Sequence, residues 1–138
     1  MFILDTNVIS ELRRAGQGKA DENVVNWAKS VDATSLYISV ITVLEIEAGI
    51  LQVERRDTQQ AAVLRSWFEN HVLRAFEKRI LPIDAAVARR CAQLHVPDPK
   101  SERDAMIAAS ALVHGMTVVT RNTKDFDRTG VQLLDPWR

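Results

Sequence analysis

Five short apolar runs alternate with longer segments of helical periodicity, and this alternation restricts the chain to a small set of folds. The runs cover residues 2–4, 36–38, 80–81, 117–120 and 131–134. Strands separated by helices pair in parallel through right-handed crossovers, because each helix returns the chain across one face of the sheet. We therefore predict an α/β fold with a mainly parallel central sheet flanked by helices.

The segments between these runs carry the apolar spacing of helices that pack on a core. Val43, Ile46 and Ile50 follow the i, i+3, i+7 pattern of one such helix. Further helices are predicted over residues 6–14, 58–78, 85–95 and 103–114. The segment 58–78 is expected to be one long or broken helix, and Gly115 is expected to cap the helix before it.

Composition is typical of a single soluble domain over residues 1–138. The chain has 138 residues, of which 46% are hydrophobic, enough to bury one core. Its 18 basic and 18 acidic residues give a net charge of zero, so an anionic partner must bind to a local basic patch. One cysteine excludes an internal disulfide and a cysteine-based zinc site. No apolar stretch approaches the ~18 residues of a membrane span, and we predict a cytoplasmic protein with no membrane partner.

Three acids occupy equivalent places in this pattern. Asp5 directly follows the first apolar run, while Glu45 and Asp104 are each expected in the first turn of a helix. Ligands of parallel sheets bind at the carboxyl ends of the strands, so the three carboxylates are expected to share one crevice. Their mutual repulsion there calls for a cation, and an all-oxygen ligand set favours Mg²⁺ or Mn²⁺.

A structural alternative exists for each acid taken singly. A carboxylate at a helix start accepts unpaired backbone N–H groups and complements the helix dipole. Thr42-x-x-Glu45 matches a capping box, and Ser101-x-x-Asp104 is a close variant of that motif. Capping is the better explanation for any one acid, whereas three acids at one sheet edge favour a metal site.

A fourth polar segment, residues 120–126, follows the run at 117–120. Thr120 and Asn122 could hold a metal-bound water or a carboxylate, Asp125 could be a fourth acid, and Arg121 could bind a phosphate. The alternative is a local turn in which Asn122 and Asp125 bond to backbone and Phe126 packs beneath it. The sequence favours neither interpretation.

Four ordered motifs across nearly the whole chain resemble those of one family. They are Leu4-Asp5-Thr6-Asn7-Val8-Ile9-Ser10; Ser39-x-x-Thr42-x-x-Glu45-Ile46 with Gly49; Asp104-x-x-Ile107-Ala108-Ala109 with His114-Gly115; and Thr120-Arg121-Asn122-x-x-Asp125-Phe126, before a Pro136-Trp137 ending. The chain resembles the PIN-domain ribonucleases, and within them the VapC toxins of type II toxin–antitoxin pairs, in particular the FitB-like branch.

The resemblance implies roles for the residues in these motifs. Asp5, Glu45 and Asp104 correspond to the family's acids, with Asp5 and Asp104 the expected direct metal ligands. Many PIN domains carry an acid where Asn122 stands, so either Asn122 or Asp125 completes the site. The predicted substrate-binding residues are Thr6, Asn7, Thr120 and Arg121. The residue before Asp104 is often alanine in the family but is Arg103 here, which could reach a phosphate or face solvent.

The activity implied by the resemblance is Mg²⁺-dependent endonucleolytic cleavage of structured RNA, such as transfer or ribosomal RNA. The implied partners are a cognate antitoxin, a second copy of the chain in a homodimer, and operator DNA reached only through the antitoxin complex. Segment 58–78 could supply partner surfaces, although core positions are favoured for Trp67 and Phe68. RNA contacts are expected from local basic residues, namely Arg13, Arg14, Lys19, Lys100, Arg103, Arg121 and Lys124. The competing function is a largely non-catalytic PIN module that regulates transcription with its antitoxin.

Overall fold

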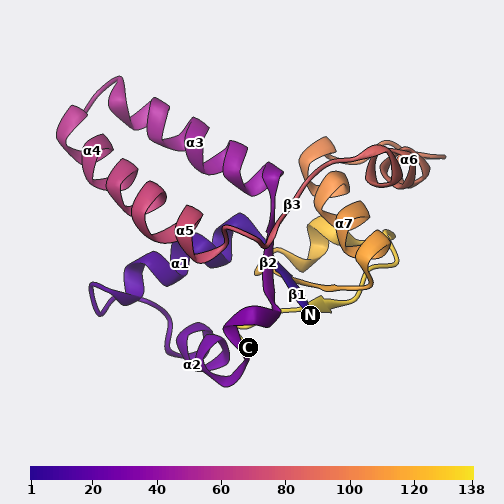
Figure 1. Cartoon of the computed structure of the whole chain (residues 1–138). Coiled ribbons are helices and arrows are strands. Elements are labelled where there is room, and N and C mark those ends of the chain that lie inside the picture. Colours follow the sequence, from indigo (N-terminus) through magenta and orange to yellow (C-terminus); the bar gives the residue numbers. More distant parts are fainter.

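A five-stranded, wholly parallel sheet forms the centre of the molecule in the computed structural model, which describes all 138 residues (Figure 1). The strand order is β3-β2-β1-β4-β5. The strands are β1 (Phe2–Leu4), β2 (Leu36–Ser39), β3 (Ile80–Leu81), β4 (Thr117–Val119) and β5 (Leu133–Leu134). The predicted α/β fold with a mainly parallel sheet is confirmed. The last strand is shorter than predicted, because Val131 and Gln132 lie outside the paired segment.

Helices connect the strands and cover both faces of the sheet. They are α1 (Thr6–Ala15), α2 (Glu22–Ser30), α3 (Val40–Glu54), α4 (Thr58–Trp67), α5 (Leu73–Ala75), α6 (Ala85–Leu94) and α7 (Glu102–His114). A π-helical turn, η2 (Phe68–Val72), joins α4 to α5, and 3-10 turns occur at η1 (Ala33–Ser35) and η3 (Thr123–Phe126). The broken helix predicted over 58–78 is thus confirmed. No helix has the length and apolar character required to cross a membrane.

Two hydrophobic cores lie on opposite faces of the sheet. Successive strand residues point to opposite sides, so Ile3 packs in the core with α6 and α7 while Leu4 packs in the core with α1, α3 and α4. Figure 1 shows α6 and α7 on one side of the strands and the long α3–α4 hairpin extending on the other. Phe68 is buried in the second core, as predicted, whereas Trp67 is half-buried against it.

Short polar residues set most of the helix starts. Asp21 begins α2 by accepting hydrogen bonds from Asn23 N and Val24 N, and Gly115 ends α7 in the left-handed conformation with φ of 67°. The sequence prediction for the start of α3 is wrong. Ser39 caps this helix by accepting from Ile41 N at 3.0 Å, so the helix begins before Thr42 and the proposed capping box with Glu45 does not form.

Candidate active site

Asp5 lies at the carboxyl end of β1, in the position that the sequence predicts. Its backbone N–H donates to Val119 O at 2.9 Å, which ties it to the end of the neighbouring strand β4. The side chain caps α1, with Oδ1 accepting from Thr6 N at 2.8 Å. Only 7% of this residue is exposed. Asp5 therefore caps a helix and also presents a carboxylate at the sheet edge. The helix-cap role and the acidic-site role predicted for this residue are compatible.

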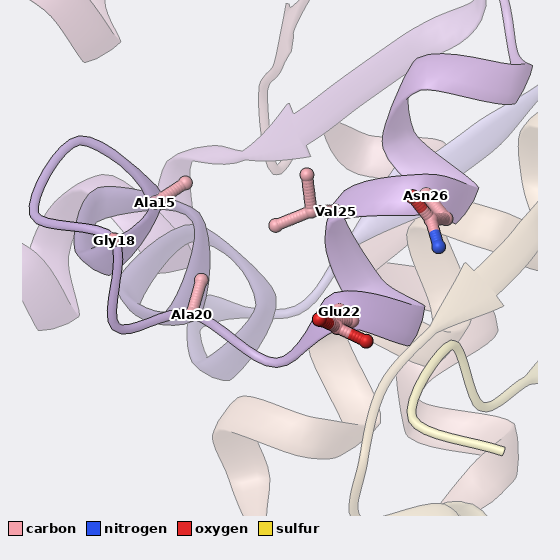
Figure 2. Close-up of a pocket in the computed structure, with 6 residues that line it drawn as sticks. All are labelled: Ala15, Gly18, Ala20, Glu22, Val25 and Asn26. Atoms are coloured by element: carbon pink, nitrogen blue, oxygen red, sulfur yellow. The ribbon is translucent and has the colours of Figure 1, made fainter.

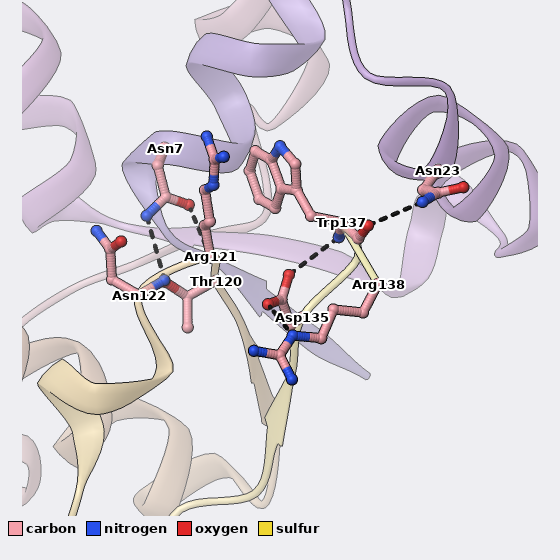
Figure 3. Close-up of polar contacts among 8 residues, drawn as sticks. All are labelled: Asn7, Asn23, Thr120, Arg121, Asn122, Asp135, Trp137 and Arg138. Atoms are coloured by element: carbon pink, nitrogen blue, oxygen red, sulfur yellow. Dashed lines mark hydrogen bonds and ion pairs between the residues drawn. The ribbon is translucent and has the colours of Figure 1, made fainter.

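The second oxygen of Asp5 belongs to a polar network with Thr120 and Asn7. The buried Thr120 hydroxyl donates to Asp5 Oδ2 at 2.8 Å, and Asn7 Nδ2 lies 3.4 Å from the same oxygen. Asn7 also donates to Thr120 Oγ1 at 3.3 Å and accepts from Arg121 N at 3.4 Å (Figure 3). Thr120 thus holds a neighbouring carboxylate, which is one of the roles predicted for it, and Asn7 contacts the same carboxylate.

Glu45 reaches the site from the second turn of α3, rather than from the first turn as predicted. Its Oε1 accepts from Thr6 Oγ1 at 2.7 Å, and Thr42 Oγ1 lies 3.1 Å from the Thr6 hydroxyl. Its Oε2 lies 3.7 Å from the guanidinium of Arg103, which belongs to the first turn of α7. Arg103 therefore pairs with an acid of the site, an arrangement that differs from both sequence-based alternatives.

Asp104 lies in the first turn of α7, as predicted, and its carboxyl group is strongly perturbed. Burial, together with the negative charges of Asp5, Asp125 and Glu45, raises the pKa of Asp104 to about 6. A hydrogen bond with Ser101 opposes this rise. Asp104 thus interacts both with its helix cap and with the other acids.

Asp5 experiences a similar environment. Burial raises the pKa of the Asp5 carboxyl, hydrogen bonds from Thr120 and Thr6 lower it, and the charges of Glu45 and Asp125 raise it again. The two perturbed carboxyls therefore respond to the same neighbouring acids. We call Asp5, Glu45, Asp104 and Asp125 the acidic cluster. Several mutually repelling carboxyl groups at one strand edge are characteristic of functional sites.

The carboxyl groups of the acidic cluster are separated from one another rather than gathered around one point. No group of three acidic, histidine or cysteine side chains is close enough to enclose a metal ion. Mg²⁺ fits such an arrangement, because it retains several waters and requires only one or two protein carboxylates. The donors are all oxygen atoms, and the neighbouring acids add to the effect of burial in raising the pKa values of Asp5 and Asp104. Such a set of oxygen donors suits a hard divalent cation, and Asp5 and Asp104 are the residues that would hold one.

Segment 120–126 combines the two structures proposed from its sequence. Asp125 N donates to Asn122 O at 3.0 Å in a tight turn, and Phe126 is buried beneath it. Asp125 nevertheless acts electrostatically on Asp5 and Asp104. Asn122 contributes its backbone N–H, which donates to Thr120 Oγ1 at 3.0 Å, whereas its side chain is exposed and makes no hydrogen bond. Asp125, rather than the side chain of Asn122, supplies the fourth negative charge.

Four of the predicted basic residues line hollows beside the acidic cluster. A groove of about 340 Å³ includes Arg13 and Arg14 together with Thr6 and Glu45. A polar pocket of about 430 Å³ is lined by Arg121, Asn122, Thr123, Lys124, Asp125 and Arg138. No ion pair or hydrogen bond joins the side chains of Lys19 or Lys100 to the acids, so the structure does not bring these two lysines into the cluster.

The hollow beside the α1–α2 loop is separate from the acidic cluster. It is lined by Ala15, Gly18, Ala20, Glu22, Val25 and Asn26 (Figure 2). Only one carboxylate, that of Glu22, borders it, and none of the predicted site residues does. The chemistry of this chain is therefore concentrated at the carboxyl edge of the sheet.

Sequence reasoning missed two contributors to the site. Thr42 was interpreted as a helix cap, yet its hydroxyl contacts Thr6 in the interior. Trp137 was noted only as part of a motif, yet its ring stacks with the guanidinium of Arg121 at 5.3 Å (Figure 3). Ser39, three residues before Thr42, is an equally good helix cap, and this is the signal that could have shown that Thr42 is free for another role.

Comparison with known proteins places this geometry in a family. The model of the PIN domain matches residues 2–132. The chain belongs to the PIN-domain family. Among PIN-domain relatives it is 34% identical to VapC ribonuclease Y4jK of Sinorhizobium fredii, covering 99% of this chain and 98% of that protein. It is 36% identical to toxin FitB of Neisseria gonorrhoeae, covering 99% of both chains.

A solved PIN-domain structure matches the whole fold. The structure of FitAB bound to an IR36 DNA fragment aligns with a TM-score of 0.89 at 36% identity, covering 100% of this chain and 96% of that one. The resemblance to PIN-domain VapC toxins of the FitB-like branch is therefore confirmed, both by sequence and by structure.

Proposed function

We propose that this protein is a metal-dependent endoribonuclease and the toxin of a VapBC-type toxin–antitoxin pair. The observation that carries the proposal is the acidic cluster of Asp5, Glu45, Asp104 and Asp125 at the carboxyl edge of a PIN-domain sheet. Relatives named as a VapC ribonuclease and as a toxin support the same activity. The substrate is a structured RNA, such as transfer or ribosomal RNA, in which unpaired bases can be reached.

Mg²⁺, or Mn²⁺ in its place, is the proposed cofactor, with Asp5 and Asp104 as its ligands. When bound, such an ion supplies an activated water and neutralises charge that develops on the phosphoryl oxygens. Thr120 and Thr6 orient the Asp5 carboxylate through their hydrogen bonds, which favour its ionised form. Thr6 likewise donates to Glu45, and the proposed role of Glu45 is to orient a water or accept its proton.

A cognate antitoxin is the proposed protein partner, and a homodimer is the proposed assembly of the toxin. The relative FitB is named as a toxin, and the matching FitAB structure is bound to DNA. We propose that this chain meets operator DNA only through its antitoxin. A purely regulatory module would gain nothing from repelling carboxylates with raised pKa values, so the cluster favours the nuclease over that alternative.

The test is cleavage of total RNA by purified, antitoxin-free protein with Mg²⁺ or Mn²⁺. Parallel reactions contain EDTA or the D5N variant, and new 5′ ends are mapped. The expected result is a set of discrete cuts that require the metal and disappear with D5N. Absence of cleavage by folded protein that binds the metal would favour the regulatory module.

A further inference from the structure

Two arginines stack on tryptophans in hollows that contain different members of the acidic cluster. The guanidinium of Arg13 lies 5.8 Å from the ring centroid of Trp67, and that of Arg121 lies 5.3 Å from the ring centroid of Trp137. Arg13 and Trp67 line the groove that contains Glu45, whereas Arg121 lines the pocket that contains Asp125. The two stacks thus border separate hollows, one beside Glu45 and the other beside Asp125.

Both arginines retain their capacity to bind an anion. Neither guanidinium forms an ion pair or a hydrogen bond within the protein, whereas the neighbouring Arg14 pairs with Glu11 and Arg138 pairs with Asp135. A cation–π contact leaves the N–H groups at the edge of the guanidinium free to bind a phosphate. Arg13 and Arg121 are therefore two unpaired guanidinium groups, each in a hollow that contains one acid of the cluster.

The second stack is held in place by the chain's last residues. Asn23 Nδ2 donates to Trp137 O at 2.8 Å, and Trp137 N donates to Asp135 Oδ1 at 3.0 Å. In Figure 3 the Arg121 side chain runs beside the indole ring, while Arg138 turns back toward Asp135. Fixing the ring restricts the rotamers of Arg121, which lowers the entropic cost of binding a phosphate there.

An RNA strand that enters this site meets repulsion at its centre. The four acids repel phosphates, and a net charge of zero provides no general attraction to compensate. Cations on both sides of the acids would hold the strand by phosphates adjacent to the one that is cleaved. One cationic end alone would leave the strand free to swing away from the acids.

We propose that a single-stranded RNA segment crosses the acidic cluster with flanking phosphates bound by Arg13 at one end and Arg121 at the other. This inference rests on the proposed nuclease function and adds the path of its substrate. Trp67 and Trp137 are positioning residues that hold the two guanidinium groups. Arg14 and Arg138 line the same hollows but are paired with Glu11 and Asp135, whereas Lys124 lines the pocket of Arg121 without an ion pair and adds a positive charge there.

The test is RNA binding without cleavage, measured in EDTA with antitoxin-free, full-length protein. The probe is a fluorescein-labelled oligouridylate of about 10 nucleotides, titrated by anisotropy across a series of KCl concentrations. R13A and R121A are each expected to weaken binding and to reduce the slope of log Kd against log [KCl] by about 0.7, the value for one single-strand phosphate contact. The control is R89A, because Arg89 is exposed on α6 and lines neither of the two hollows.

The positioning role is tested with W137F and the double variant R121A/W137F. Phenylalanine preserves the packing but weakens the cation–π contact, so W137F is expected to lose part of the RNA affinity while remaining folded. The double variant should bind no more weakly than R121A, since the ring acts through the arginine. Additive losses would show that Trp137 contacts RNA independently and would overturn its positioning role.

The outcomes separate this inference from the proposed function. Wild-type protein that cleaves RNA while R13A and R121A behave like R89A would overturn the strand path and leave the nuclease intact. Loss of affinity in only one of the two arginine variants would also overturn a path that spans both ends. Wild-type protein that neither binds nor cleaves RNA would instead refute the proposed nuclease.

Discussion

The Thr120 hydroxyl donates a hydrogen bond to Asp5 Oδ2 at 2.8 Å, joining the carboxyl ends of β4 and β1 across 115 positions of sequence. Both groups are buried, and the bond favours the ionised form of a carboxyl whose pKa is raised by burial. Thr120 therefore opposes part of the effect of burial on the acid that we propose as a metal ligand. Its contribution can be separated from packing, because valine matches its shape and serine retains its hydroxyl.

T120V is expected to lower nuclease activity and to move its acidic limb to higher pH. Loss of the hydroxyl removes one of the two hydrogen bonds that lower the pKa of Asp5, so the carboxyl protonates at a higher pH than in wild type. The lost bond to a charged group also costs about 2 kcal/mol of stability. The measurement is kcat/KM against pH, with thermal unfolding in parallel. T120S should retain the wild-type profile, and a T120V profile identical to that of T120S would refute the role.

D104N is expected to stabilise the protein at neutral pH while abolishing activity. The folded-state pKa of Asp104 is about 6, above its ordinary value of 3.8. Stability from this group is fully present below pH 3.8 and is lost as pH rises through about 6, because the folded state then carries an unfavourable charge. An unscreened shift of this size is worth about 3 kcal/mol, which solvent exposure reduces to about 1 kcal/mol.

The measurement is Tm of D104N and wild type at several pH values without metal. At pH values well above 6, D104N should unfold about 3 °C higher, and the difference should vanish in acid. D5N should gain less stability. Asp5 uses one carboxylate oxygen to cap α1 and the other to accept from the Thr120 hydroxyl, whereas asparagine has only one acceptor oxygen for these two donors. A Tm for D104N below that of wild type at neutral pH would show that capping outweighs repulsion at Asp104.

The parts of the site that could be predicted are those determined by residues close together in the sequence. Asp5 directly follows an apolar run, so its position at a strand end requires no knowledge of the rest of the chain. Asp104 follows Ser101 at the spacing of a helix start, and it lies in the first turn of α7. Glu45 was placed one turn too early, because Ser39 and Thr42 are both good caps and local sequence does not rank them.

The remaining features depend on contacts between distant segments. The Arg103–Glu45 pair joins α7 to α3, and the Arg121–Trp137 stack joins the end of β4 to the chain's last residues. Periodicity and spacing carry no information about such contacts, because they follow from how the sheet and helices are assembled. Helix α2 was missed for a different reason: Val24 is its only buried residue, so its apolar pattern is weak.

R103A is expected to leave stability nearly unchanged and to tighten metal binding. The Arg103–Glu45 pair is partly exposed, so its loss should alter Tm by less than about 2 °C. A cation beside the acids opposes a second cation, so the Mg²⁺ concentration for half-maximal cleavage should fall about 3-fold. Titrations of R103A and the surface control R89A provide the comparison. An increase in KM for RNA with no change in metal dependence would instead assign Arg103 to phosphate binding.

Mg²⁺ is expected to raise the Tm of the wild-type protein through the acidic cluster. An ion that binds only the folded state stabilises it by RT ln(1 + [L]/Kd), or about 1.4 kcal/mol at roughly ten times Kd. The measurement is thermal unfolding against MgCl₂ concentration at constant ionic strength. D5N and D104N should each lose most of the shift, whereas D98N should retain it, because Asp98 is exposed in the loop before α7 and exerts no charge effect on Asp5 or Asp104. Equal shifts in all four proteins would mean that the ion acts on the general surface rather than on these carboxylates, and the proposed ligands would have to be abandoned.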